Sequence, residues 1–249
     1  MKDYFRITRS PWHSFVFVLP LLLLYEATVL LANAGMRYPV VNGADALLYG
    51  TLRSLGVGGV LGSSLVLAVV AGIAVYFLDP EGRRGGTRFR LFPGVLAESS
   101  VYALVLGTLV AFLTSLLLSG GGLLQIGGGS LNFGQRLALS LGAGLYEELV
   151  FRLLLTGGLA WLFRKLLPKK TGSEAGLGTP VALAVLVSAL IFSGFHYLGA
   201  YGDPFQLGSF TFRFIAGLVL AALFAVRGFA VAAWTHALYD VFLVFAGRA

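Results

Sequence analysis

The stretch of sequence that decides the fold is LALSLGAGLYEELVFRLLL, residues 137–155. It is apolar over a length close to the roughly 20 residues that a helix needs to cross the hydrocarbon core of a bilayer. It nevertheless carries three ionisable residues, Glu147, Glu148 and Arg152. An ionisable group at the bilayer centre costs at least about 2.5 kcal/mol, so such groups are expected to face a protein interior or a water-filled cavity. The segment therefore predicts a transmembrane helix that carries a polar site.

The composition of the whole chain agrees with a membrane protein. Of its 249 residues, 57 % are hydrophobic and 12 % are charged, and the mean hydropathy is +0.87. A soluble domain has roughly 25 % charged residues. These values exclude a disordered chain, a coiled coil and an ordinary soluble domain. The absence of cysteine from the sequence excludes a disulfide framework, a thiolate metal site and a thiol nucleophile.

Seven apolar segments are long enough to span a bilayer. We therefore predict an all-α, polytopic bundle of about seven transmembrane helices, with residues 1–249 forming a single membrane domain. The fourth segment continues in a helical pattern to about Leu167, which indicates a longer or a broken helix. An eighth span would reverse the orientation of the C-terminal half. The predicted segments are 12–31, 60–78, 95–118, 137–155, 181–200, 207–226 and 229–245.

Lysine and arginine indicate the orientation in the membrane. With the N-terminus inside, most of the 18 basic residues fall on the inner side. The outer side receives five, Arg37, Arg53, Arg136, Arg213 and Arg248. The positive-inside rule then predicts a cytoplasmic N-terminus and an outer C-terminus. The expected location is a bacterial cell membrane, which the chain crosses several times. The net charge of +7 is read as a sign of orientation, so no nucleic-acid partner is expected.

The first segment has two interpretations. A basic start, the apolar run from Phe15 to Leu24 and the sequence Ala32-Asn33-Ala34 resemble a cleavable signal peptide. The stretch is, however, long enough to span, and Glu26 interrupts it before the possible cleavage site. Retention as a membrane helix is therefore the favoured interpretation.

The two glutamates of the fourth segment are expected to differ in role. Glu148 and Arg152 are four residues apart, so they share a helix face and can neutralise one another. Glu147 points about 100° away from Glu148. A carboxylate placed in this way is a candidate general base for a water molecule.

Two later segments contribute further polar pairs. Phe192 and His196 share a face at the end of the fifth segment, and His236 and Asp240 share a face in the seventh. For each pair alone, a structural role in helix packing or as a polar clamp between helices is as good an explanation as a functional role. Several intramembrane carboxylates and imidazoles on three late helices are more easily explained by one functional site.

Four other residues receive structural interpretations. Glu98 lies near the start of its segment, where an acidic residue favours the helix dipole. Glu26 is either a boundary residue or part of the lining of a water cavity. Arg213 and Arg227 flank a short apolar stretch and are expected to extend toward the membrane interfaces.

The three motifs together resemble a known family. Glu147-Glu148-x-x-x-Arg152, Phe192-x-x-x-His196 and His236-x-x-x-Asp240 are similar to the ordered motifs of the CPBP family of intramembrane proteases. That family includes the type II CAAX prenyl endopeptidases and bacterial proteins of the Abi group. The resemblance implies a catalytic core over residues 136–246 that hydrolyses a peptide bond of a membrane-associated peptide or protein.

The resemblance also implies roles for individual residues. Glu147 would activate the attacking water, and His196 would position it. His236 and Asp240 would bind the water or stabilise the oxyanion, while Glu148, with Arg152 and Phe192 in support, would hold the geometry. Glu147, His196 and His236 could also bind zinc or another divalent metal, since two histidines and a glutamate form a known zinc site. The sequence contains no H-E-x-x-H run of the kind found in zinc proteases. We therefore favour a water activated by glutamate and leave the presence of a metal open.

Two other classes of function remain open at this point. A transporter or ion channel could use Glu147, Asp240 and the two histidines as a proton or cation path, although the sequence shows no internal repeat. A non-catalytic membrane scaffold or an immunity-type protein could keep the same residues for packing.

Overall fold

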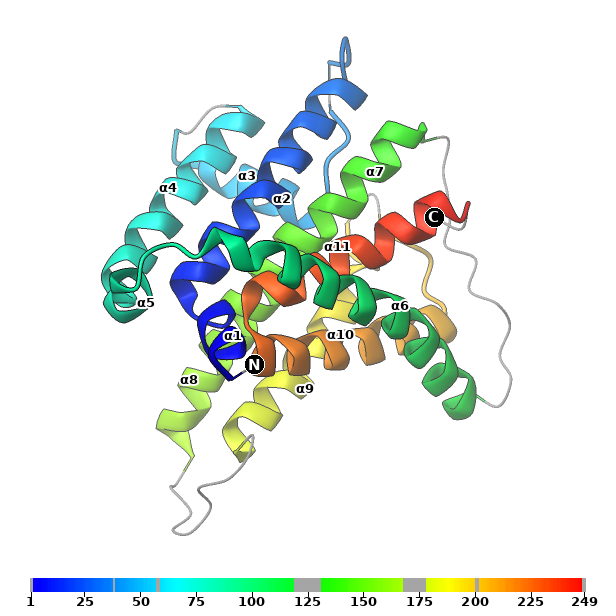
Figure 1. Ribbon diagram of the computed structural model, residues 1–249. Helices are drawn as coiled ribbons and strands as arrows, with labels where there is room; N and C mark the ends of the chain where they lie inside the picture. The colour runs from blue at the N-terminus through cyan, green and yellow to red at the C-terminus, as the bar shows by residue number, and fades with distance from the viewer. Residues whose placement is uncertain are drawn as a thin grey trace.

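The computed structural model describes residues 2–37, 39–56, 59–118, 131–167, 178–199 and 202–247. Every regular element in these ranges is a helix, which confirms the predicted all-α class (Figure 1). The Gly-rich stretch 120–129 and most of the basic connector between 164 and 179 lie outside the described residues.

Eleven α-helices, a 3₁₀ turn and a π-helix follow one another over the described residues. Their bounds are α1 Lys2–Thr8, α2 Pro11–Ala32, α3 Gly43–Ser54, α4 Val60–Leu78, α5 Pro80–Arg84, the 3₁₀ turn η1 Phe89–Leu91, α6 Phe92–Leu117, α7 Phe133–Gly142, the π-helix η2 Ala143–Thr156, α8 Gly157–Leu166, α9 Thr179–Phe195, α10 Leu207–Arg227 and α11 Phe229–Phe245.

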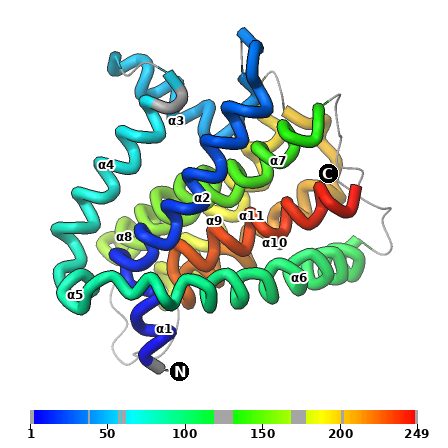
Figure 2. Tube along the Cα trace, turned by 45° about the horizontal axis from the view of Figure 1, so that its top comes forward, coloured from blue at the N-terminus to red at the C-terminus, as the bar shows by residue number. Residues whose placement is uncertain are grey.

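Helix α11 lies at the centre of the bundle. It packs against α2, α6, α7, η2 and α10, and Figure 2 shows it between α7 and α6. Its first half is rich in alanine, and Ala230 to Ala233 are fully buried. Small side chains allow neighbouring helices to approach closely where lipid offers no hydrophobic driving force. The last helix of the chain is therefore the one around which the others assemble.

The predicted segments agree closely with the helices. The second and seventh coincide with α4 and α11, and the first, third, fifth and sixth match α2, α6, α9 and α10. Among the described residues, α2, α10 and the helix over 89–117 are long and apolar enough to cross a membrane. Helix α3 was not predicted, because its 12 residues are too few to span a bilayer. The number of spans stays a prediction.

The fourth segment forms a continuous helical rod built from α7, η2 and α8. Asn132 begins it with a capping box, in which its side chain and that of Gln135 bind each other's backbone N–H groups. The rod ends at Leu166, which confirms the predicted helical continuation to about Leu167. The middle of the rod is a π-helix, a form that is rare and often found at functional sites.

Gly144 marks the closest approach of η2 to α11. A Cβ atom at this position would overlap the side chain and backbone N of Ala237 and the carbonyl oxygen of Ala233. Glycine is required here because the two backbones themselves are in contact. This approach brings Glu148 of η2 within hydrogen-bond distance of His236 on α11.

Glu98 and Arg227 correct two of the predictions. Arg227 is only 5 % exposed, and it donates from Nε and Nη2 to the two carboxylate oxygens of Glu98 and from Nη2 to Thr8. It therefore does not extend to an interface. Glu98 lies beyond the first turn of α6, too far from the helix start for the proposed dipole role. The pair instead neutralises two charges between α6, α10 and α1, with Tyr4 donating to Glu98 as well.

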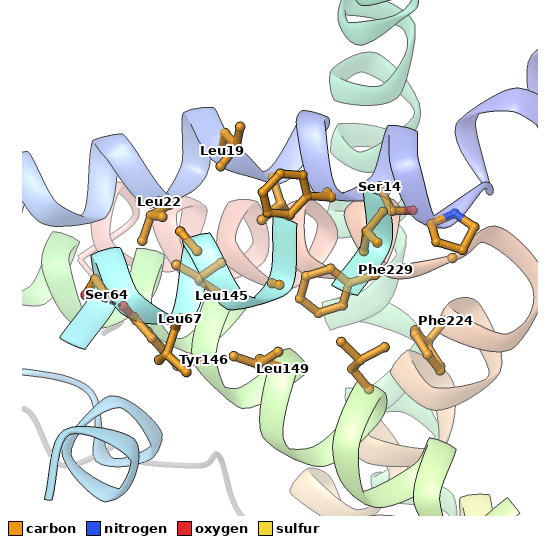
Figure 3. A pocket seen from close by; sticks show the side chains of 18 of the residues that line it. Ser14, Leu19, Leu22, Ser64, Leu67, Leu145, Tyr146, Leu149, Phe224 and Phe229 are labelled. Carbon is orange, nitrogen blue, oxygen red and sulfur yellow. Dashed lines mark hydrogen bonds between the residues drawn. The ribbon is translucent and has the colours of Figure 1, made fainter. Parts of the chain in front are cut away.

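An apolar cavity of about 370 Å³ lies between α2, α4 and η2 (Figure 3). From η2 it is lined by Leu145, Tyr146, Leu149 and Leu153. Tyr146 also donates to Glu26 over 3.5 Å, so Glu26 lies beside this region rather than at the polar site described below. The η2 helix thus separates an apolar cavity from the polar face that carries Glu147, Glu148 and Arg152.

We expect Gly144→Ala to destabilise the protein by about 1–3 kcal/mol, because the added methyl group overpacks the contact with α11. Thermal unfolding in detergent measures this effect. Gly158→Ala in α8 is the matched control, since a Cβ there meets no atom within 4 Å. Equal stability of the two variants would contradict the close packing of η2 on α11.

Candidate active site

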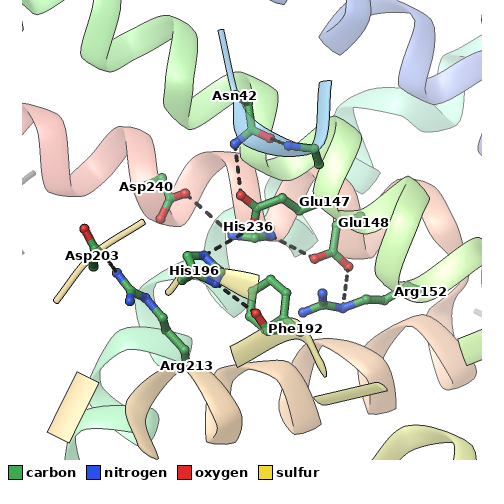
Figure 4. Close-up of polar contacts among 11 residues, drawn as sticks. Asn42, Glu147, Glu148, Arg152, Phe192, His196, Asp203, Arg213, His236 and Asp240 are labelled. Atoms are coloured by element: carbon green, nitrogen blue, oxygen red, sulfur yellow. Dashed lines mark hydrogen bonds and ion pairs between the residues drawn. The ribbon is translucent and has the colours of Figure 1, made fainter. Parts of the chain in front are cut away.

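The polar residues of the three motifs meet at one place in the bundle (Figure 4). Glu147, Glu148 and Arg152 come from η2, Phe192 and His196 from the end of α9, and His236 and Asp240 from α11. Glu148, Arg152, Glu147 and His236 are all buried. Their neighbours on the helices are apolar, so the cluster is a polar island inside the bundle.

Glu148 forms the fully buried centre of the cluster. Its Oε1 accepts a hydrogen bond from His236 Nδ1 over 2.8 Å. Its Oε2 lies 3.2 Å from Arg152 Nε, as expected from their four-residue spacing. Both oxygens of Glu148 therefore already have charged or polar partners, and this carboxylate connects η2 to α11.

Glu147 has a different environment from its neighbour. Its Oε1 accepts a hydrogen bond of 2.9 Å from the side-chain amide of Asn42. Its Oε2 lies 4.0 Å from His196 Nε2, which is beyond direct hydrogen-bond distance. One oxygen of Glu147 is thus held in place, while the other faces an imidazole across a gap that a water molecule can bridge.

His196 lies at the C-cap of α9 rather than inside the helix. Its Nδ1 is 2.9 Å from the carbonyl oxygen of Phe192, and its own carbonyl accepts from the backbone N–H of Asp203 over 2.9 Å. Since a carbonyl can only accept, Nδ1 carries the hydrogen, and Nε2 of the neutral ring is an acceptor directed toward Glu147. Arg213, expected to extend to an interface, forms a salt bridge with Asp203 beside this turn.

Phe192 packs among the charged residues. The Arg152 guanidinium lies 4.2 Å from the centre of its ring, and the ring of His196 meets it edge to face at 5.0 Å. An aromatic face next to a desolvated cation stabilises that cation. Phe192 therefore packs against both Arg152 and His196.

His236 and Asp240 complete the cluster from α11. His236 Nε2 lies 3.6 Å from Asp240 Oδ2, which agrees with the shared face predicted from their spacing. The Asp240 side chain is 26 % exposed and that of His196 is 23 % exposed, compared with 9 % for Glu147. The cluster therefore opens toward the surface on the side of His196 and Asp240.

Asn42 was missed by the sequence analysis. It precedes α3, in the N-terminal half of the chain, and its side chain caps that helix. An asparagine before a helix normally indicates only a cap. Its contact with Glu147 depends on a separation of 105 residues along the chain, which no local pattern records.

The proposed metal ligands do not converge into one group. Within the described part of the chain, no three His, Asp or Glu side chains lie close enough together to hold a metal ion. Nδ1 of His236 is engaged by Glu148, as in many metal sites, yet Glu147 and His196 face each other as a pair. This arrangement does not fit a three-ligand site, so no step of the mechanism below is routed through a metal.

Asp45, in the first turn of α3, is buried and accepts a hydrogen bond from Tyr25. Burial raises the pKa of this carboxyl from 3.8 to about 6. Its ionisation therefore disfavours the folded state, with no cost below about pH 4 and the full cost above about pH 6.

We expect Asp45→Asn to become more stable relative to the wild type as the pH rises from 4 to 7.5. Asparagine keeps an oxygen for Tyr25 and cannot ionise. Thermal unfolding at several pH values checks this result. A difference in Tm that stays constant over the whole range would contradict the buried ionisation.

We expect Arg152→Met to lower the free energy of unfolding by about 3–5 kcal/mol, because it leaves the Glu148 carboxylate buried without its cation. Arg164→Met is the control, since Arg164 is an exposed residue of α8. Denaturation of both variants in the same detergent measures the effect. Equal stability would show that Glu148 does not depend on Arg152.

Comparison with known proteins supports the interpretation of the three motifs. Residues 129–242 match the family model described as Type II CAAX prenyl endopeptidase Rce1-like, and this range includes every motif residue. No curated protein and no solved structure matches the chain. Together with the long apolar helices, the match indicates an integral membrane protein. The chain therefore contains, over residues 129–242, a domain of the Rce1-like family of type II CAAX prenyl endopeptidases.

Proposed function

We propose that the protein is an intramembrane endopeptidase in which Glu147 activates a water molecule that attacks a peptide bond of a membrane-associated substrate. The observation that carries this proposal is the difference between two adjacent carboxylates. Glu148 is held by Arg152 and His236, whereas Glu147 keeps one oxygen directed at His196. General acid and base catalysis needs a carboxylate such as Glu147, which has an oxygen that can bind the reacting water.

The attacking water would lie between Glu147 and His196. One of its hydrogens would bond to Glu147 Oε2 and the other to His196 Nε2. As the water oxygen attacks the peptide carbonyl carbon, Glu147 takes a proton from it. The same proton then passes to the nitrogen of the leaving amine when the carbon–nitrogen bond breaks.

His236 is placed to stabilise the oxyanion that forms during this attack. Its Nδ1 is held by Glu148, so the ring has a fixed orientation, and its Nε2 is directed toward the side of Asp240. Since Nδ1–H already donates to Glu148, the ring would act as an imidazolium, whose Nε2–H donates a hydrogen bond to the developing oxyanion. Fixed donors of this kind usually account for a large part of the rate enhancement. Asp240 would orient this imidazole or the substrate beside it.

The substrate is proposed to be a peptide in an extended conformation. A helical segment satisfies its own backbone hydrogen bonds and hides its carbonyl groups, so it must unfold before hydrolysis. The exposed edge formed by His196 and Asp240 is the side from which such a segment reaches the buried Glu147. The family match favours a CAAX-type, lipid-modified peptide as the first substrate to test.

We expect Glu147→Gln to reduce kcat by about 100- to 10,000-fold, the usual contribution of a general base. The assay follows release of the C-terminal fragment from a prenylated peptide by the purified protein in lipid vesicles. Glu81→Gln, in α5, is the control, because Glu81 is exposed and distant in sequence from the motifs. Full cleavage by the folded Glu147→Gln protein would remove Glu147 as the base.

The same assay distinguishes the remaining alternatives. A glutamate-activated water predicts that cleavage continues in the presence of a chelator. Loss of cleavage that zinc restores would instead indicate a metal-bound water. If the folded wild-type protein cleaves no membrane-associated peptide, a scaffold or an ion-coupled transporter becomes the better interpretation.

A further inference from the structure

We infer that Asn42 is a positioning residue for the proposed reaction, because its amide holds the Glu147 carboxylate with one oxygen turned toward His196. The inference rests on the proposed function of Glu147. It adds to that function a residue from the N-terminal half of the chain, outside the matched family domain and outside the three motifs.

The two ends of the Asn42 amide have separate partners. Its Oδ1 accepts a hydrogen bond from the backbone N–H of Ala44 over 2.9 Å, and its Nδ2 donates to Glu147 Oε1 over 2.9 Å. The backbone N–H can only donate, so the amide oxygen must face Ala44. The amide nitrogen is thereby directed at Glu147, and the orientation of the side chain is fixed by chemistry at both ends.

The contact is buried at both residues. Taken over the whole residue, Asn42 is 6 % exposed and Glu147 is 7 % exposed, so water competes little for the hydrogen bond between them. A hydrogen bond to a carboxylate is stronger than one between neutral groups. Holding Oε1 stops rotation of the carboxylate and leaves Oε2 on the side of His196, where the proposed water binds.

The start of α3 is itself held between the elements that form the site. A Cβ atom on Gly142, at the end of α7, would lie 2.8 Å from the Asn42 Cβ, so the two segments are in close contact. A Cβ atom on Gly43 would lie 3.5 Å from the ring of Phe195, the residue before His196. The first turn of α3 therefore lies between the end of α7 and the end of α9.

A second contact fixes the rotation of α3. Asp45, one turn after Asn42, accepts a hydrogen bond of 2.5 Å from Tyr25 of α2. The Tyr25 ring packs edge to face on Tyr146, the residue before Glu147, at 5.2 Å. Asn42 therefore contacts Glu147 from the start of a helix that is fixed in position by Tyr25 of α2, which itself packs on η2.

The test separates positioning from helix capping. Aspartate and serine are both good N-caps, so Asn42→Asp and Asn42→Ser keep the bond to Ala44 and lose the amide donor. We expect kcat for cleavage of the prenylated peptide to fall about 10- to 100-fold in each variant, with KM changed by less than about 2-fold. Tm should stay close to that of the wild type in Asn42→Ser.

Asn132→Asp and Asn132→Ser are the matched controls. Asn132 caps α7 in the same way but is exposed and lies outside the site. These variants should keep the wild-type kcat. If they do, a loss in the Asn42 variants is not a general effect of changing a capping asparagine.

The inference is overturned if folded Asn42→Ser keeps the wild-type kcat, since Asn42 would then be a cap and nothing more. If Asn42→Asp does not fold because it places a carboxylate beside Glu147, the uncharged serine variant decides the result. Failure of this inference differs from failure of the proposed function. The former leaves Glu147→Gln inactive, whereas the latter leaves it active.

Discussion

The buried carboxylate of Glu148 is the constraint on which the rest of the structure depends. A lone carboxylate inside an apolar bundle is strongly disfavoured, so Glu148 must keep both Arg152 and His236 as partners. These partners come from its own helix and from the central helix α11. The requirement sets the rotation of η2, and Gly144 allows the backbones to come close enough to meet it.

The orientation of Glu148 determines what Glu147 can do. Adjacent residues on a helix point in different directions, so a helix that turns Glu148 toward α11 turns Glu147 toward α3 and the end of α9. Both oxygens of Glu148 are then engaged by His236 and Arg152, whereas one oxygen of Glu147 faces His196 at 4.0 Å. The two histidines also differ, because His236 Nδ1 is held by the Glu148 carboxylate, whereas His196 Nδ1 is held by the neutral backbone carbonyl of Phe192.

The N-terminal helices contribute more than additional hydrophobic surface. Helix α1, helix α6 and the C-terminal end of α10 are joined through Thr8, Glu98 and Arg227, and the Glu98–Arg227 ion pair is largely buried. Helix α3 places an amide on Glu147. Both contacts cross more than 100 residues of sequence, and both satisfy a charge that an apolar environment would otherwise exclude.

The helical class, the approximate limits of the apolar helices and the residues of the three motifs can all be predicted from the amino-acid sequence alone. This is possible because hydrophobic runs of fixed length, and pairs spaced by four residues such as Glu148 with Arg152, are local properties of the chain. Only the tertiary structure decided that Glu98 pairs with Arg227, that His236 binds Glu148 in addition to facing Asp240, and that Asn42 reaches Glu147. These contacts depend on which helices face one another, and that arrangement brings together residues that no single segment contains.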